Sequence, residues 1–163
     1  KSEVSGWPVI GWLAKATGTV FIARNAKEAK GQQTLFEERI RSGHRLLFFP
    51  EGTSTDGRRV LPFKPTLFAA FYSHGLEHVM QIQPVTVLYH APPGRNQRFY
   101  GWWGAMVLAP HLLLTLAVPR QGRVEVVFHD PVRVDDFRSR KELSAHCENE
   151  IRAAMTKAGV HPA

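Results

Sequence analysis

The sequence has 163 residues, of which 44% are hydrophobic, and it carries a formal net charge of +7. This size and apolar content argue against a disordered chain and predict one domain with a hydrophobic core. The basic excess favours an anionic partner, such as a phosphorylated substrate, an anionic membrane or nucleic acid. Nucleic acid is the weakest of these, because the basic residues form no run of five and are not interleaved with aromatic residues.

The single cysteine, Cys147, excludes an internal disulfide and a cysteine-based metal site. It fits a reducing compartment such as the cytoplasm. No histidine pair has metal spacing on an unbroken helix, and no nucleotide-binding glycine loop is present, so neither a metal nor a cofactor is indicated. The chain opens at Lys1 without a signal-peptide layout, and we expect it to be a fragment that lacks its N-terminal part.

The first half of the chain alternates between helical and strand patterns. A helix is predicted over residues 8–17 and a short buried strand over 19–23, TVFIA. A second helix is predicted over 26–42, closed by Gly43, and a second strand over 45–49, RLLFF.

The second half begins with a predicted helix over 64–74, with Pro65 in its first turn, where proline is tolerated. A strand over 80–89, interrupted by Pro84, and an alternating strand over 123–129 follow. Strands that alternate with helices predict an α/β domain with a largely parallel sheet flanked by helices.

The last predicted helix begins near Ser139, which has capping-box spacing to Glu142. It runs to about Lys157 and stops at Gly159. Cys147 falls on this helix as a passive residue.

The apolar segment 102–118, WWGAMVLAPHLLLTLAV, is nearly long enough to span a bilayer. Pro110 and His111 lie at its centre, so we interpret it as a helix that is buried or lies at an interface. Trp102 and Trp103 suit a membrane interface and equally suit a core.

Two segments carry the strongest functional signal, GTVFIAR at Gly18–Arg24 and FPEGTSTDG at Phe49–Gly57. Ligands bind beyond the carboxyl ends of parallel strands. The strand over 19–23 would deliver Arg24 to that edge, and the strand over 45–49 would deliver residues 50–59.

These segments resemble two sequence blocks of the glycerophospholipid acyltransferase family, G-x-x-F-x-x-R and F-P-E-G-T-R-S. The sequence IQPVTV at Ile82–Val87 is similar to a third block, and KSEV at the start resembles a K-x-E-L stretch. The resemblance covers essentially the whole chain, and FPEGT is its specific part. It implies a glycerol-3-phosphate acyltransferase-like fold that is truncated at its N-terminus, with residues 1–163 forming the C-terminal portion of a single acyltransferase domain.

The sequence departs from the family pattern in two ways. Ser54 and Thr55 stand where the family has R-S, although Arg58 and Arg59 lie close enough to replace the missing charge. The catalytic H-x-x-x-x-D block is absent, since none of the eight histidines has an aspartate five positions on. The resemblance places the catalytic His and Asp upstream of Lys1, so we expect this chain alone to transfer no acyl group.

The resemblance implies transfer of an acyl group from a thioester to a glycerol hydroxyl, which needs a general base, oxyanion donors and a fixed acceptor. Arg24 suits the acceptor phosphate because guanidinium binds phosphate in a bidentate way. Gly52 allows close backbone approach, and the Thr53 hydroxyl can donate to phosphate. Glu51 either holds the acceptor hydroxyl or orients a cation. The full predicted substrate-binding set is Arg24, Glu51, Gly52, Thr53, Ser54, Lys1 and Lys64.

Each of these residues also has a structural interpretation. Arg24 suits a surface salt bridge, the glycine-rich turn suits an ordinary loop, and Glu51 suits a carboxylate bonded to the backbone of its own loop. Lys1 and Lys64 suit solvated lysines. The His129-Asp130 pair ends a strand before Pro131, and we interpret it as structural.

The main hypothesis is a membrane-associated acyltransferase of phospholipid biosynthesis on the cytoplasmic face of the inner membrane. It would move a fatty acyl group from acyl-CoA or acyl carrier protein, as co-substrate, to 1-acylglycerol-3-phosphate (lysophosphatidic acid). The alternative acceptor is another lyso-lipid, such as lyso-ornithine lipid, which the change at Ser54 and Thr55 makes credible. A non-catalytic phospholipid or membrane-binding module is the alternative from another class.

Overall fold

The computed structural model describes residues 11–12, 16, 37–73 and 75–160. The chain divides into two compact units, Lys1–Leu47 and Phe48–Ala163. In the first unit, residues 11, 12 and 16 are helical, as the sequence predicts. The strand predicted over 19–23 lies outside the described residues, and the single acyltransferase domain over 1–163 stays a prediction.

The end of the second predicted helix is confirmed. Residues 37–41 are helical, and Gly43 follows with a φ of 76°. The His44 N–H donates to the Arg39 carbonyl at 3.1 Å, and the Gly43 N–H donates to the Ile40 carbonyl at 2.9 Å. These two bonds form a Schellman motif, whose left-handed position favours glycine.

The strand predicted over 45–49 is wrong. Residues 44–49 are irregular, and the side chains of Leu47 and Phe49 are 77% and 72% exposed. An apolar run forms a strand only where a second strand supplies its hydrogen bonds, and the described part of the chain offers none to this segment.

The helices labelled in the second unit are η3 Pro65–Tyr72, η4 Leu76–His78, α3 Leu108–Leu116, η5 Val134–Asp136 and α4 Arg140–Lys157. The helix predicted over 64–74 is therefore present, but it is a 3₁₀ helix. Its proline stands in the first turn, as expected.

The strands of this unit are β1 Gln81–Ile82, β2 Val85–His90, β3 Arg123–Phe128 and β4 Val132–Arg133. Pro84 interrupts the first strand run, as predicted. β1 pairs with β4, and β2 pairs with β3. The two strand pairs follow one another and form one antiparallel ribbon. Residues 83–84 separate β1 from β2, whereas residues 129–131 separate β3 from β4. The side of the ribbon formed by β3 and β4 therefore carries one extra residue, in the segment that begins at His129.

Both pairs are antiparallel, so the described residues do not show the largely parallel sheet that the sequence predicts. A long connection that contains a helix usually joins parallel strands. Here the connection of residues 91–122 leaves and returns at the same end of the ribbon, because β2 and β3 pair antiparallel and His90 faces Arg123. The Tyr100 hydroxyl donates to Gln121 Oε1 at 2.9 Å and accepts from the Gly122 N–H at 2.8 Å.

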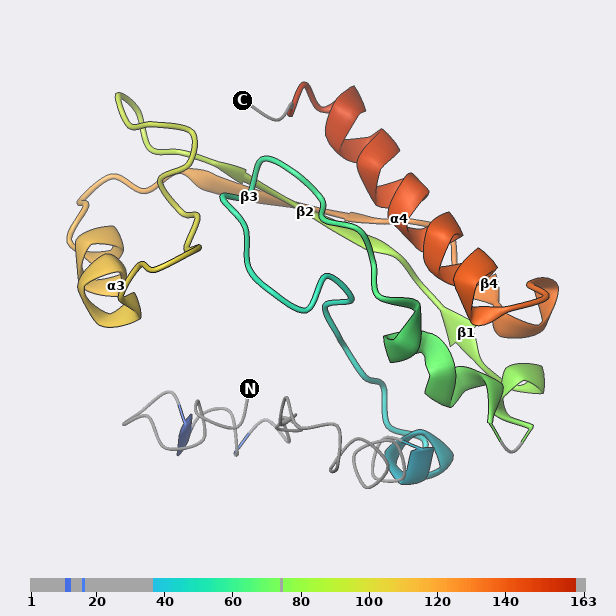
Figure 1. Cartoon of the computed structure of the whole chain (residues 1–163). Helices are drawn as coiled ribbons and strands as arrows, with labels where there is room; N and C mark the ends of the chain where they lie inside the picture. Colours follow the sequence, from blue (N-terminus) through green and yellow to red (C-terminus); the bar gives the residue numbers. More distant parts are fainter. Residues whose placement is uncertain (1–10, 13–15, 17–36, 74, 161–163) are drawn as a thin grey trace. The chain divides into compact units, whose positions relative to one another are not determined.

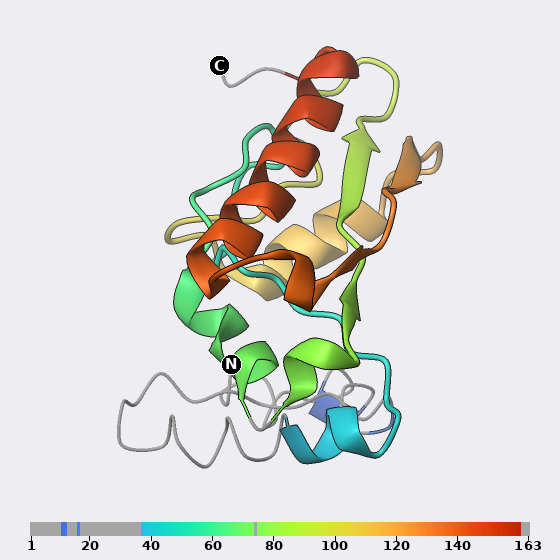
Figure 2. The same cartoon turned by 90° about the vertical axis from the view of Figure 1, so that its right-hand side faces the viewer.

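The core of this unit lies where α4 packs against η3 and β2 (Figures 1 and 2). Its most completely buried apolar side chains are Phe68, Phe71, Leu143 and Val134. Phe48 adds a third ring, whose centroid lies 5.3 Å from that of Phe68 in an edge-on arrangement. Such aromatic packing stabilises a core beyond the apolar area that it buries.

α4 has the ends that the sequence predicts. The Glu142 N–H donates to the Ser139 side chain at 3.3 Å, and Gly159 follows the helix with a φ of 70°. Cys147 lies buried on this helix, and burial raises the pKa of its thiol to about 11. The protonated thiol is consistent with a passive residue.

The helix predicted inside 102–118 is α3, but it is not buried. None of its nine residues is buried, and Leu113 and Leu116 are each 68% exposed. Among the described residues, no helix has the length and apolar character needed to cross a membrane.

We expect Ser139→Ala to lower the free energy of unfolding by about 1 kcal/mol, because the first turn of α4 loses its side-chain cap. Urea denaturation monitored by circular dichroism measures this loss. Thr156→Ala is the control, since that hydroxyl bonds only within the last turns of the same helix. Equal losses for the two variants would contradict the capping role.

Candidate functional site

The segment that carries FPEGT forms a closed loop over residues 50–64. Its ends meet where the Lys64 N–H donates to the Pro50 carbonyl at 2.9 Å. A tight turn opens the loop, with the Gly52 N–H donating to the Phe49 carbonyl at 3.1 Å and Gly52 at a φ of 72°. This left-handed conformation favours glycine at the position.

Two of the predicted binding residues, Gly52 and Lys64, lie together. A Cβ added at Gly52 would lie only 2.7 Å from Lys64 Nζ, so the ammonium group lies directly over the glycine backbone. Thr53 and Ser54 follow Gly52 and are exposed. The start of the loop therefore presents one cation and two hydroxyl groups, an arrangement that suits a small anionic group.

Glu51 is bonded to its own loop. Its Oε2 accepts from the Leu61 N–H at 2.8 Å. Burial raises the pKa of Glu51, although the Leu61 bond and the charge of Arg152 act in the opposite direction. This contact agrees with the structural interpretation of Glu51, a carboxylate bonded to the backbone of its own loop. A direct contact between Glu51 and an acceptor hydroxyl stays a prediction.

The second half of the loop is organised by Asp56, which is only 2% exposed. Its Oδ1 accepts from the Arg58 N–H at 3.1 Å and from Arg59 Nε at 3.3 Å. Its Oδ2 lies 3.0 Å from Arg59 Nη2 and 3.1 Å from Arg98 Nε. One buried carboxylate thus binds two guanidinium groups, which come from the loop and from the connection between β2 and β3.

The pKa of Asp56 reflects this environment. Burial alone would raise the pKa, but the hydrogen bonds from Arg59 and the Arg58 N–H outweigh it, together with the charges of Arg59 and Arg98. The net pKa is lower than the ordinary value, so the carboxylate is ionised at neutral pH. Because Arg59 is committed to Asp56, it is a poor replacement for the arginine that the family has after FPEGT, and the replacement by Arg58 stays a prediction.

The sequence did not predict that Asp56 of this loop is bound by Arg98 and packed against Gly101. A Cβ at Gly101 would lie 2.7 Å from the Asp56 carbonyl oxygen, so the two segments touch along their backbones. The contact joins residues more than forty positions apart, and no local pattern marks it. The sequence shows only that an aspartate follows three hydroxyl-bearing residues, and this pattern does not indicate which residues Asp56 contacts.

Two other predicted residues, Lys1 and Arg24, lie outside the described residues. The meeting of Arg24 with the FPEGT loop therefore stays a prediction.

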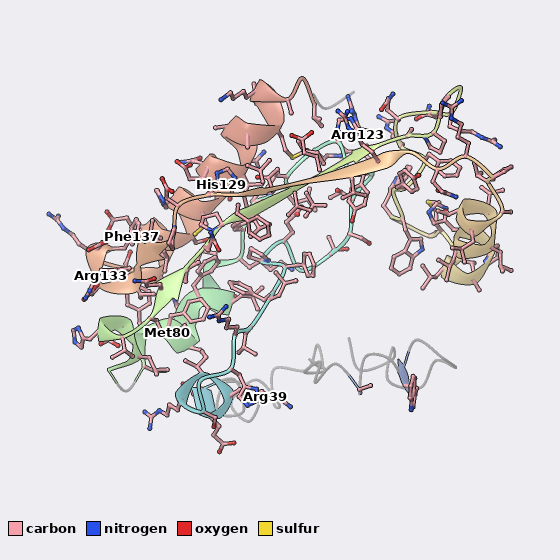
Figure 3. All side chains as sticks on the ribbon, turned by 180° about the vertical axis from the view of Figure 1, so that it is seen from behind. Arg39, Met80, Arg123, His129, Arg133 and Phe137 are labelled. Atoms are coloured by element: carbon pink, nitrogen blue, oxygen red, sulfur yellow. The ribbon has the colours of Figure 1, made fainter. Side chains whose placement is uncertain are left out.

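His129 stands at the extra residue of the ribbon, and Figure 3 shows it at the far end of β3 from Arg123. Its Nε2 lies 2.8 Å from the Thr86 hydroxyl, and its Nδ1 lies 3.8 Å from Glu150 Oε2. An open pocket of about 350 Å³ lies beside it, lined also by His146 and Asp130. These contacts hold the ring between β2 and α4, which agrees with a structural role for His129.

We expect Asp56→Asn to remove part of the acid sensitivity of folding. The folded-state pKa of Asp56 is lowered, so its stabilisation is complete above the unfolded-state pKa and is lost as the pH falls through the folded-state pKa. At pH 7 the variant should lose about 2 kcal/mol of unfolding free energy, the typical value of hydrogen bonds to a charged group. The loss should shrink as the pH falls towards 3.

Urea denaturation at a series of pH values measures the difference between the two proteins. Asp136→Asn is the control, because this carboxyl is exposed. A wild-type to Asp56→Asn difference that stays constant from pH 7 to pH 3 would contradict the lowered pKa.

The comparisons with known proteins come from a family model, curated relatives and a solved structure. The family model described as Acyltransferase matches residues 1–88, more than half of the chain. A lyso-ornithine lipid O-acyltransferase from Rhodobacter capsulatus is 66% identical over 155 residues, covering 95% of this chain and 56% of the relative. A protein of the same name from Brucella abortus is 38% identical over 170 residues, covering 97% and 62%.

A 1-acyl-sn-glycerol-3-phosphate acyltransferase from Neisseria gonorrhoeae is 27% identical, covering 95% of this chain and 59% of the relative. The crystal structure of the 1-acyl-sn-glycerophosphate acyltransferase PlsC from Thermotoga maritima matches with a TM-score of 0.60 and 21% identity, covering 99% of this chain and 56% of that chain. This match shows a shared fold. The chain spans about half the length of the curated relatives that it matches, and it belongs to the Acyltransferase family.

Proposed function

We propose that this chain is part of an O-acyltransferase that moves a fatty acyl group from a thioester to the hydroxyl of a lyso-ornithine lipid. The observation that carries the proposal is the 66% identity, over 95% of this chain, to the lyso-ornithine lipid O-acyltransferase of Rhodobacter capsulatus. The second candidate acceptor is 1-acylglycerol-3-phosphate, which the relative from Neisseria gonorrhoeae favours.

The charges around the FPEGT loop support an acceptor without a phosphate. A phosphate monoester carries nearly two negative charges and is bound best by bidentate arginine. Here Ser54 and Thr55 replace the family's R-S, and Asp56 binds Arg59. Lys64 lies beside Gly52, where the two ends of the loop meet, and one ammonium group is sufficient for the single negative charge of an ornithine carboxylate.

The proposed reaction needs a general base in addition to the residues of the FPEGT loop. A general base must take the proton of the acceptor hydroxyl as the hydroxyl oxygen attacks the thioester carbonyl, and the thiolate then leaves. The 163 residues contain no H-x-x-x-x-D sequence, so we propose that a His and an Asp outside them supply the base. Acyl-CoA or acyl carrier protein is the proposed donor, and the cytoplasmic face of the inner membrane is the proposed location.

We expect Ser54→Arg, made in the natural protein that contains this chain, to shift acceptor preference towards 1-acylglycerol-3-phosphate. A new charge-assisted hydrogen bond to phosphate should raise the ratio of its kcat/KM to that of lyso-ornithine lipid by about tenfold or more. Competition between the two acceptors, with one labelled acyl donor, measures the ratio. Ser54→Gln is the control, since it adds length without charge. Preference of the wild-type protein for 1-acylglycerol-3-phosphate would reject the proposed acceptor.

We also expect the purified 163-residue chain to transfer no acyl group, because it lacks the proposed base. The assay supplies acyl-CoA and both acceptors, and the natural protein that contains the chain serves as the positive control. Turnover by the chain alone would show that the base lies among these residues.

A further inference from the structure

We propose that the connection between β2 and β3, residues 91–122, is a membrane-docking element that seats α3 in the surface of an anionic bilayer. Within this subsection the connection is called the excursion. It begins and ends at the pair His90↔Arg123, the last pair of the antiparallel ribbon. Figure 1 shows α3 beyond that end of the ribbon, away from α4 and η3.

The base of the excursion is well defined. The Tyr100 hydroxyl bonds both Gln121 and Gly122, so the first arm is tied to the point where the second arm returns to the ribbon. The Gln121 amide donates to the carbonyls of Thr115 and Val118 at 2.9 and 2.8 Å, at the C-terminal end of α3. α3 is therefore held on a structured base.

The apolar side chains of the excursion are largely exposed. Residues 99–119 contain no Asp, Glu, Lys or Arg. Val107 is 69% exposed and Leu114 is 60% exposed, and the contacts of α3 with other labelled elements are sparse. Successive residues point about 100° apart around a helix, so Leu112, Leu113 and Leu114 make α3 apolar on several sides. A helix of that kind is stable in water only when something else covers it.

The partner that covers α3 is a lipid surface, because basic residues lie on both sides of the apolar segment. Arginines flank the uncharged segment on both sides, Arg95 before it and Arg120 and Arg123 after it, while Arg98 is held by Asp56. The side chain of Arg123 is 72% exposed, and Figure 3 shows it at the α3 end of β3. An apolar centre with a basic rim matches the acyl chains and anionic head groups of a bilayer.

The geometry also sets the depth of docking. Nine helical residues extend about 14 Å, far less than the roughly 30 Å needed to cross the hydrocarbon core. α3 therefore lies in the interface, with its leucines among the upper acyl segments.

The excursion is coupled to the FPEGT loop. Arg98, at its base, binds the buried Asp56 carboxylate at 3.1 Å, and Gly101 packs against the Asp56 backbone. Docking of α3 would hold the loop at the membrane surface, where a lyso-lipid acceptor resides. Only this step rests on the proposed function, since membrane docking by α3 does not require the chemistry.

The first test places an environment-sensitive fluorophore on Leu113→Cys in the full chain. Cys147 can stay, because its buried thiol is protonated and reacts slowly. With phosphatidylglycerol vesicles we expect a blue shift and quenching by brominated acyl chains. Val79→Cys is the matched control, since Val79 is 78% exposed at the end of η4 and carries no such prediction. Equal responses at both positions, no response at position 113, or a blue-shifted probe before vesicles are added would overturn the proposal.

The second test uses vesicle sedimentation to separate the hydrophobic contribution to membrane binding from the electrostatic contribution. Leu113→Asp should lower binding about tenfold, by placing a charge in the apolar contact, while Val79→Asp leaves it unchanged. Arg120→Gln should lower binding to phosphatidylglycerol vesicles roughly fivefold at low salt, and Arg140→Gln should have little effect. Equal effects of the excursion variants and their controls would reject α3 as the contact. Vesicle binding without acyl transfer by the natural protein would reject the proposed function and leave the docking proposal intact.

Discussion

The buried carboxylate of Asp56 is the interaction on which the described part of the candidate site depends. A carboxylate that is 2% exposed is costly to remove from water unless charged or N–H donors replace its hydration. Asp56 receives four such contacts, from the Arg58 N–H, from two nitrogens of Arg59 and from Arg98. The Arg98 contact joins two segments that are distant in the sequence. The FPEGT loop and the base of the 91–122 connection therefore share one electrostatic centre.

This arrangement divides the basic residues of the site between two tasks. Arg59 and Arg98 neutralise a buried charge and fix the loop, so their contribution is structural. Lys64 lies over the backbone of Gly52, where a ligand would meet it together with Thr53 and Ser54. A count of arginines near the motif overstates the positive charge available to an acceptor. The proposal of a lyso-ornithine lipid depends on this distinction as well as on the relatives.

The sequence predicts those features whose causes are local. Gly43, Gly159 and the Ser139 cap end or begin helices through bonds within a few residues, and Pro84 breaks the strand in which it stands. The FPEGT motif likewise identifies the family from five adjacent residues. Features with distant causes were missed or mistaken. The apolar run 45–49 looks like a strand, but a strand needs a partner. The contact of Asp56 with Arg98 and Gly101 appears only after the chain has folded.

The segment 102–118 shows most clearly why composition alone is insufficient. An apolar segment of this kind is stable only when its side chains are removed from water. The second unit does not itself bury α3, so something else must cover the helix. Burial inside the protein and burial in a membrane satisfy the requirement equally, so the sequence cannot choose between them. The structure adds the antiparallel ribbon, the bonded base at Tyr100 and the arginines on either side of the apolar segment. In a member of the Acyltransferase family whose proposed acceptor is a membrane lipid, these features give an exposed apolar helix a consistent physical role.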